Sequence, residues 1–296
     1  MTAPLRRTLC VIGPGLIGSS VLRRAREKPG LAARLVAADR DEAVCARVRE
    51  LGLADEVTTD AARAASEADI VMICVPVGAI PAVAAAVIPA MKPGAILTDV
   101  GSTRRSVVDG VRPFLRPDVP YVPAHPMAGT EHSGPDAGFA TLFEDRWCLL
   151  TPPEDASTPD AIATIEALWH AMGARTRIMD VDHHDKICAI VSHVPHLLAF
   201  SICQTADSLA TDLRSEVLDF AASGFRDFTR IAASDPTMWR DIFLHNREAV
   251  LEMLDRFRSD AETLAQAISE GDEATIVASI ERGRRIRRSL IENRQA

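Results

Sequence analysis

The segment 125–134 holds the densest group of side chains in the first half of the chain that could transfer protons. Its first residue, His125, directly follows a predicted strand at 121–124. A histidine at a strand end can accept the proton of a substrate hydroxyl as hydride leaves the same carbon. We therefore predict that His125 is catalytic. The structural alternative is a loop histidine that caps a backbone group.

Ser102 is the second candidate for this chemistry, because it follows the turn after a predicted strand at 95–100. Its hydroxyl could orient His125 or a substrate oxygen. It could equally cap a helix that begins near Thr103, since serine is a favoured N-cap residue. The two roles are compatible.

A glycine-rich turn near the start of the chain predicts a site for a dinucleotide. Gly13-Pro14-Gly15-Leu16-Ile17-Gly18 fits the pattern G-x-G-x-x-G, between an apolar run at 9–12 and a helical segment at 19–25. The first glycine allows the tight turn, the second lets the pyrophosphate approach, and the third lets helix and strand pack closely. The helix N-terminus then attracts phosphate. We expect cofactor contacts from Gly13, Gly15, Leu16, Ile17 and Gly18.

Asp39 lies 21 positions after Gly18, at the end of the next predicted strand, 34–39. An acid about 20 residues after the glycines accepts from the ribose 2′-hydroxyl, and its charge repels a 2′-phosphate. NAD is therefore favoured over NADP. Arg40 keeps NADP open, because it could stack on adenine or pair with a 2′-phosphate. An ordinary turn residue is the alternative for Asp39.

Strands and helices alternate through the first 180 residues, which predicts an α/β fold with a doubly wound, Rossmann-type sheet. Buried strands are expected at 9–12, 34–39, 70–75 and 95–100. Ligands of such sheets bind beyond the carboxyl ends of the strands. We therefore add Val75 and Pro76, which end the third of these strands, to the predicted cofactor contacts.

From residue 181 onward the apolar spacing is helical and no clear strand is found. This change predicts a dinucleotide-binding domain at 1–180 and an all-helical domain at 181–296. The helical runs are apolar enough to pack against a second subunit, so we expect a homodimer through the helical domain.

Two histidines in the helical half, His193 and His196, are three residues apart and share a helix face. We expect one to be a buried structural residue and the other to face the site. Together with 183–185 they suggest a metal site. No third ligand has convincing spacing, however, and hydride transfer needs no metal. We therefore predict no metal.

Arginines and acids cluster at 224–241, where Arg226 or Arg230 could bind an anionic substrate. Arginine binds carboxylates through two parallel hydrogen bonds. The alternative is a structural ion pair with Asp227 or Asp235.

Composition narrows the class of protein further. The net charge is −8, which argues against nucleic-acid partners and acidic membranes. We expect no apolar run to reach the ~18 residues of a spanning helix, and the N-terminus has no signal-peptide core. The six scattered cysteines form no C-x-x-C pair. We therefore expect a cytoplasmic protein with reduced thiols, no membrane and no nucleic acid.

Taken together, these motifs resemble the prephenate dehydrogenase family, which acts in tyrosine biosynthesis. The resemblance extends from Leu9 to about Arg258. Its motifs are the glycine turn, Asp99-Val100-Gly101-Ser102, His125-Pro126-Met127-Ala128-Gly129-Thr130-Glu131, Ser192-His193-Val194-Pro195-His196, and Gly224-Phe225-Arg226-Asp227-Phe228-Thr229-Arg230 with Trp239-Arg240-Asp241. The glycine turn is generic, whereas the ordered set is highly specific.

The resemblance implies oxidative decarboxylation of prephenate to 4-hydroxyphenylpyruvate, with hydride transfer to NAD. It implies that His125 acts on the ring hydroxyl with Ser102 as its partner, and that Arg230 binds a substrate carboxylate. It further implies that His196 contacts the substrate. Residues that would line or gate the pocket are Glu131, Asp227 and Trp239.

Three other functions remain open at this point. Arogenate, or both cyclohexadienyl acids, could be the substrate. A β-hydroxyacid-type dehydrogenase would rely on a helical lysine, and Lys186 is the single lysine of the helical half. A sensor that binds NAD without turnover is the alternative that is not an enzyme.

Overall fold

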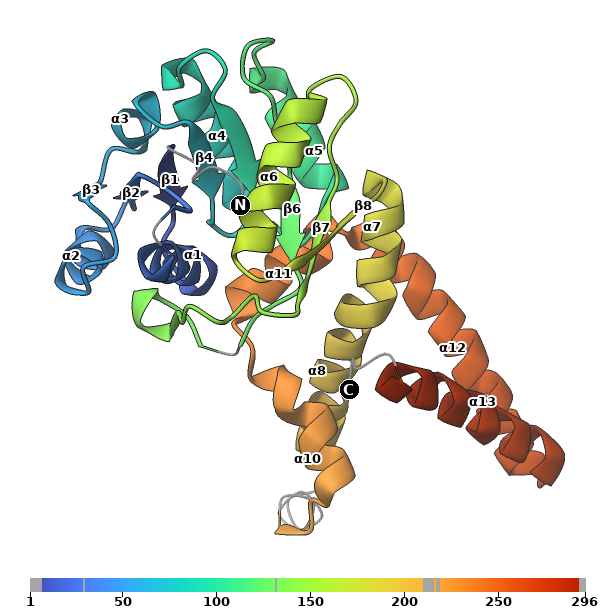
Figure 1. Cartoon of the computed structure of the whole chain (residues 1–296). Helices are drawn as coiled ribbons and strands as arrows, with labels where there is room; N and C mark the ends of the chain where they lie inside the picture. The colour runs from blue at the N-terminus through green and yellow to red at the C-terminus, as the bar shows by residue number, and fades with distance from the viewer. Residues whose placement is uncertain (1–6, 29, 131, 210–215, 217–218, 293–296) are drawn as a thin grey trace. The chain divides into compact units, whose positions relative to one another are not determined.

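A sheet of strands forms the centre of the first half of the chain, with helices on both sides (Figure 1). The computed structural model describes residues 7–28, 30–130, 132–209, 216 and 219–292. Five parallel strands form a sheet in the order β3-β2-β1-β4-β5. They are β1 (Thr8–Ile12), β2 (Arg34–Ala38), β3 (Glu56–Thr58), β4 (Ile70–Ile73) and β5 (Ile96–Asp99). The order reverses between β1 and β4, which is where such sheets bind ligands. The predicted Rossmann-type fold is confirmed.

Helices cover both faces of the sheet. Neighbouring residues of a strand point to opposite faces, so each buried strand contributes side chains to two apolar cores. Leu9 and Val11 of β1 belong to one apolar core, and Cys10 and Ile12 belong to the other. The first core contains residues of α1 (Leu16–Glu27), α2 (Glu42–Glu50) and α6 (Pro159–Ala171). The second contains residues of α3 (Ala61–Ser66), α4 (Ile80–Val87) and α5 (Arg105–Val111).

A second sheet has the order β6-β7-β8. Its strands are β6 (Ala124–Pro126), β7 (Trp147–Leu150) and β8 (Arg175–Ile178). The strand predicted at 121–124 is therefore misplaced. Tyr121 forms only an isolated bridge with Leu97, whereas His125 lies inside β6 and pairs with Leu149. Pro120 directly precedes the predicted segment and Pro123 lies inside it, and neither has an N–H to donate to a ladder.

After β8, the part of the chain that the structure describes forms helices joined by turns and short irregular segments, and no strand. Its elements are α7 (Val181–Cys188), a π-helical turn (Ala189–His193), α8 (Val194–Asp207), α10 (Ser223–Thr229), α11 (Pro236–His245), α12 (Arg247–Glu270) and α13 (Glu273–Glu292). Short 3-10 turns are η1 (Val77–Ala79), η2 (Ile88–Ala90), η3 (Arg112–Phe114), η4 (Pro135–Ala137) and η6 (Arg230–Ala233). Contacts between residues divide the chain into two compact units, Met1–Arg247 and Glu248–Ala296. The domain boundary near residue 180 stays a prediction.

The continuous helical stretch Val181–Asp207 is long and apolar enough, by length and composition, to cross a membrane. The expectation that no run reaches this length was therefore wrong. The criterion alone is weak, since core helices of soluble proteins also meet it. The stretch carries His184, Asp185 and His193, all of which are buried in the folded chain.

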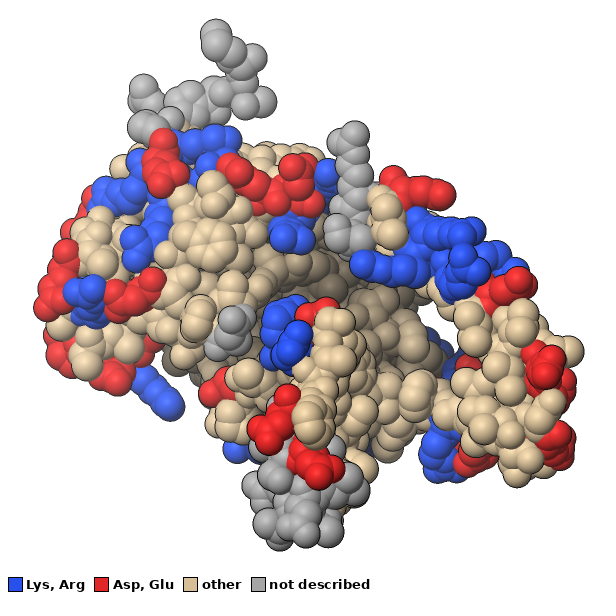
Figure 2. All heavy atoms as spheres, turned by 90° about the horizontal axis from the view of Figure 1, so that it is seen from below, with Lys and Arg blue, Asp and Glu red and all other residues tan. Residues whose placement is uncertain are grey.

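Charged side chains of both signs lie on the surface. On the face that Figure 2 presents, acidic and basic groups lie beside one another, mostly toward its margins, and uncharged side chains occupy much of the middle. Mixed charge of this kind agrees with a modest net charge of −8.

The glycine turn makes a testable prediction about stability. A Cβ at Gly18 would lie 2.7 Å from the carbonyl oxygen of Gly13, whereas a Cβ at Gly15 would meet nothing within 4 Å. We expect Gly18→Ala to lower the free energy of unfolding by about 1–3 kcal/mol through overpacking. The matched variant Gly15→Ala should keep stability within about 0.5 kcal/mol but bind dinucleotide more weakly. Denaturant titration and dinucleotide titration measure the two effects. Equal stabilities of both variants would contradict this packing argument.

Candidate active site

The glycine turn lies at the carboxyl end of β1, where α1 begins. Gly13 has φ +81°, a conformation that favours glycine. Gly15 is the N-cap of α1 and has no side chain to accept from the first helical amides, so these can bind an anion. Leu16 and Ile17, partly buried, pack against the first apolar core. The turn therefore fits the pyrophosphate of a dinucleotide.

Other predicted cofactor contacts lie at neighbouring strand ends. Val75 follows β4 and packs on the glycine turn, since its Cγ1 lies 2.7 Å from the place of a Cβ on Gly13. Pro76, next to it, is exposed. Asp39 follows β2, and its Oδ1 accepts from the amide of Asp41 at 2.9 Å. Arg40 beside it is exposed.

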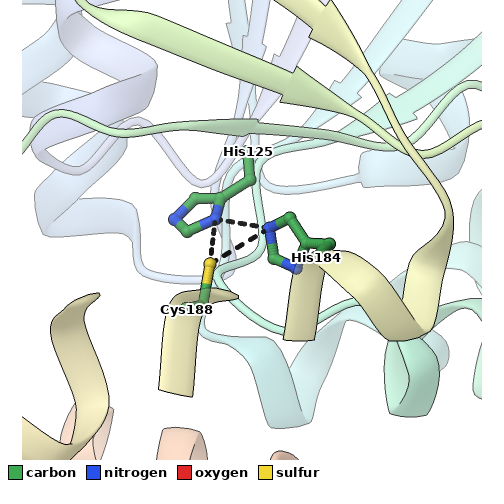
Figure 3. Close-up of side chains that lie close together, drawn as sticks. All are labelled: His125, His184 and Cys188. Atoms are coloured by element: carbon green, nitrogen blue, oxygen red, sulfur yellow. Dashed lines mark hydrogen bonds between the residues drawn. The ribbon is translucent and has the colours of Figure 1, made fainter. Parts of the chain in front are cut away.

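His125 is held by a buried row of hydrogen bonds (Figure 3). Its Nδ1 lies 2.9 Å from Nε2 of His184, and Nδ1 of His184 lies 2.9 Å from Oδ1 of Asp185. His184 is fully buried and His125 is only 9% exposed. The row connects β6 of the small sheet to α7 of the helical segment.

Asp185 also caps helix α5, which corrects the expectation for Ser102. Its two carboxylate oxygens accept from the backbone amides of Arg104 at 2.8 Å and Arg105 at 2.9 Å. The helix begins at Arg105, later than expected, and the cap comes from α7. Ser102 is partly buried and has no hydrogen bond to the described residues, so its predicted bond to His125 stays a prediction.

The row of hydrogen bonds determines where the protons reside. The pKa of Asp185 is lowered: burial raises it, but hydrogen bonds from His184 and the two amides outweigh burial. The ionised carboxylate therefore accepts a hydrogen bond from Nδ1–H of His184, so Nε2 of a neutral His184 is an acceptor. His125 must then donate from Nδ1. Its Nε2 keeps a free lone pair and can accept a substrate proton.

Burial and positive charge keep these imidazoles neutral. Desolvation holds the pKa of His125 well below its usual range, helped by His184, Arg104 and His193. Desolvation also lowers the pKa of His184, against the opposing effect of Asp185. A neutral imidazole is the form that can accept a proton.

Arg104 brings fixed charge next to this row. Its guanidinium is fully buried and pairs with Asp99 at 2.8 Å. Asp99 also accepts from the hydroxyl of Tyr121 at 2.6 Å. Arg104 further donates to the carbonyl oxygen of Ala124 at 3.3 Å, which ties β6 to the carboxyl end of β5.

His193 and His196 differ in their surroundings. His193 is 1% exposed, and its Nδ1 accepts from Asn246 at 3.0 Å. His196 is half-buried, donates from Nδ1 to the carbonyl oxygen of Ser192 at 2.9 Å, and stacks on Trp239 with ring centroids 3.7 Å apart. Burial lowers the pKa of both, that of His193 to about 4.

Helix α11 carries Trp239 to the carboxyl edge of the large sheet. A Cβ on Gly78, in the turn after β4, would lie 3.0 Å from Oδ2 of Asp241 and 3.3 Å from Nε2 of His245. Trp239 is 5% exposed, and its buried Nε1 has no partner among the described residues. It can therefore donate a hydrogen bond to a ligand.

The remaining predicted residues are more open. Arg230 begins η6, is exposed, and lies near enough to His196 for its charge to help lower that pKa. Asp227 is exposed on α10. Glu131 lies outside the described residues.

Sequence reasoning missed His184, Asp185 and Cys188 as neighbours of His125. The first two were noticed only as possible metal ligands. Cys188 lies one helical turn after His184, and this spacing could have revealed that the two share a face.

The fold and the site define a class: a parallel sheet with a dinucleotide turn, next to a buried neutral histidine, belongs to a dinucleotide-dependent dehydrogenase. Residues 22–178 match the family model of the prephenate dehydrogenase nucleotide-binding domain. Residues 180–282 match that of the prephenate dehydrogenase dimerization domain. The chain belongs to the prephenate dehydrogenase family and is an NAD-dependent oxidoreductase.

Individual relatives agree with this assignment. Cyclohexadienyl dehydrogenase of Zymomonas mobilis is 41% identical over 284 residues, covering 95% of each chain. A crystal structure of prephenate dehydrogenase from A. aeolicus, in complex with hydroxyphenyl propionate and NAD+, has a TM-score of 0.89 at 28% identity and covers 96% of this chain and 98% of that one. Arogenate dehydrogenase of Synechocystis has a TM-score of 0.82 at 25% identity, covering 95% and 99%.

The buried histidines predict a loss of stability in acid. The pKa of His193 is about 4 in the folded chain, against ~6.5 when unfolded. Below pH ~6.5 the unfolded chain binds a proton that the folded chain does not, so stability falls as the pH falls. Between pH 7 and pH 5, we expect the free energy of unfolding of His193→Gln to fall by about 2 kcal/mol less than that of the parent. Denaturant titrations at both values measure this difference. Parallel pH profiles would refute the assigned shift.

Proposed function

We propose that the chain catalyses the oxidative decarboxylation of prephenate to 4-hydroxyphenylpyruvate. The observation that carries the proposal is the row Asp185–His184–His125, which leaves Nε2 of a neutral His125 as an acceptor. The names of the relatives support the substrate class. They are a cyclohexadienyl dehydrogenase, a prephenate dehydrogenase and an arogenate dehydrogenase, and prephenate and arogenate are both cyclohexadienyl acids.

The reaction divides between cofactor and protein. NAD would be held at the glycine turn and would supply the hydride acceptor for the ring carbon that bears the hydroxyl. His125 takes the hydroxyl proton at Nε2 as the carbonyl develops, and His184 with Asp185 holds the ring in the required tautomer. The bond to the opposite carboxylate then breaks, CO2 leaves, and its electron pair makes the ring aromatic. Aromatisation provides the driving force, so the protein mainly aligns and polarises.

The predicted cofactor contacts would bind NAD and would set the preference for NAD over NADP. The pyrophosphate would lie at the N-terminus of α1, next to Gly13, Gly15 and Gly18. Asp39 has carboxylate acceptor capacity beyond its bond to Asp41 and would accept from the ribose 2′-hydroxyl. Its charge favours NAD over NADP, with Arg40 available for the adenine.

Residues from the helical half would bind the anionic end of the substrate. Arg230 is the proposed partner of a carboxylate, and the stacked pair His196 and Trp239 offers an imidazole acceptor and an indole donor. Ser102 would contact the substrate hydroxyl. Pocket-lining roles for Asp227 and Glu131 belong to the same proposal.

We further propose a cytoplasmic homodimer that associates through residues 181–296. The dimerization-domain match at 180–282 supports both the assembly and a boundary near residue 180. The stretch Val181–Asp207 would be part of the folded helical half, not a membrane span, because Asp185 bonds to α5 and His193 bonds to Asn246. The negative net charge disfavours nucleic acid.

Dual specificity is the second candidate, because one relative at 41% identity is named a cyclohexadienyl dehydrogenase. Arogenate carries an amino acid side chain where prephenate carries a keto acid. Both substrates share the ring hydroxyl and the departing carboxylate, so the same row of hydrogen bonds serves either.

The deciding experiment measures NADH or NADPH absorbance with prephenate and arogenate, each with NAD and NADP. We expect turnover with prephenate and NAD, and a collapse of kcat in His125→Asn with NAD affinity largely unchanged. Comparable rates with both acids would establish dual specificity. Nucleotide binding without turnover in all four mixtures would favour a sensor, and normal turnover by His125→Asn would refute its role.

Arg230 can be tested against a neighbouring arginine. Arg230→Ala should raise KM for the substrate roughly tenfold or more, since a charged hydrogen bond contributes about 1.5–3 kcal/mol, with kcat changed less. Arg226 on α10 donates to the backbone oxygen of Ala221, which precedes the helix, so Arg226→Ala is the matched control and should leave KM near the parent value. Equal KM values in both variants would contradict the assignment.

A further inference from the structure

His125 and two neighbouring side chains form a cluster with the composition of a metal site. Nδ1 of His125, Nε2 of His184 and Sγ of Cys188 all lie within 4.8 Å of one another. The two nitrogens are 2.9 Å apart, and the sulfur is 3.7 Å from the first and 3.4 Å from the second. Figure 3 shows the three atoms pointing toward a common centre. His184 and Cys188 are fully buried.

These separations are close to those required around a tetrahedral ion. Zinc binds nitrogen at about 2.0–2.1 Å and sulfur at about 2.3 Å, which places its donors roughly 3.3–3.6 Å apart. Each observed separation is within about 0.5 Å of that range. His184 and Cys188 are four residues apart on α7, so the helix fixes two ligands on one face. Strand β6 supplies the third.

The surroundings of the cluster also suit a metal. Asp185 accepts from Nδ1 of His184 at 2.9 Å, which leaves Nε2 for coordination. Histidine ligands of metals are commonly oriented by a carboxylate in this way. Asp99 and Arg104 pair with each other. The Asp185 carboxylate and a Cys188 thiolate would then balance a divalent charge.

We propose that His125, His184 and Cys188 form an inhibitory site for a zinc-type divalent cation. Imidazole and thiolate together favour Zn²⁺ over Mg²⁺ or Ca²⁺. On binding, Cys188 releases its thiol proton to solvent, and water fills the fourth position. The proton on Nδ1 of His125 moves to Nε2 as the ion takes Nδ1. Nε2 then has no lone pair for a substrate proton, so turnover stops. The inhibition rests on the proposed role of His125; the binding does not.

The test combines spectroscopy and kinetics on the full-length protein. Co²⁺ serves as the probe for binding, because a cysteine ligand produces a thiolate-to-cobalt charge-transfer band. We expect this band at one equivalent of Co²⁺, together with Zn²⁺ inhibition that a chelator reverses. Cys188→Ser and Cys188→Ala should lose the band, keep basal turnover, and need roughly tenfold or more Zn²⁺ for half-inhibition.

Cys203→Ser is the matched control, since Cys203 lies on α8 outside the cluster, and it should behave like the parent. Absence of the charge-transfer band in the parent, or equal zinc sensitivity of Cys188→Ser and the parent, overturns the site. If the parent is active but insensitive to Zn²⁺, the metal site fails and the proposed function stands. If the band forms but no cyclohexadienyl acid is oxidised, the binding site stands and the role of His125 in catalysis fails.

Discussion

The carboxylate of Asp185 is the interaction on which the site depends most. One buried group accepts from the first amides of α5 and from the imidazole of His184. The positive end of a helix stabilises such an anion, and each amide that it binds would otherwise be unsatisfied. Loss of this carboxylate would leave several buried donors without a partner, at about 1–3 kcal/mol each. The same atoms that hold α7 against α5 therefore orient His125.

Arg104 provides the complementary constraint from the sheet. It is fully buried and is compensated by Asp99, while its guanidinium donates to the carbonyl oxygen of Ala124 in the strand that carries His125. Its charge makes protonation of the nearby imidazoles less favourable. The backbone amide of Arg104 is also bound by Asp185. The position and the protonation state of His125 thus depend on one connected set of buried polar groups. A substitution of any one of these groups would also change the surroundings of the others.

Family membership agrees with this arrangement. The nucleotide-binding and dimerization models meet at residues 178–180, immediately before α7 begins at Val181. The chain's contacts nevertheless join α7, α8 and α11 to the sheets in one compact unit. A site built from both parts of the chain requires such contacts, because His184 and Trp239 are contributed from beyond the matched nucleotide-binding domain. Sequence similarity and spatial compactness therefore describe different boundaries in the same molecule.

Local signals in the sequence determined the large sheet and the class of cofactor. The apolar runs of β1 and β4 were predictable because strands buried on both faces are nearly continuously hydrophobic. The glycine turn was predictable because its backbone conformation and close packing exclude side chains. His125 was identified, but its strand was misplaced by a few residues, since β6 is short and lies among prolines.

Only the tertiary structure decided which residues surround His125. His184 and Cys188 are 59 and 63 positions away in the chain, and no local pattern specifies a contact across that separation. The same holds for the cap of α5, where a carboxylate from α7 acts in place of the neighbouring Ser102. The sequence by itself determined the elements and the cofactor turn, because these follow from local chemistry. The packing of α7 against the sheet decided the protonation of the site, because desolvation and buried partners exist only in the folded chain.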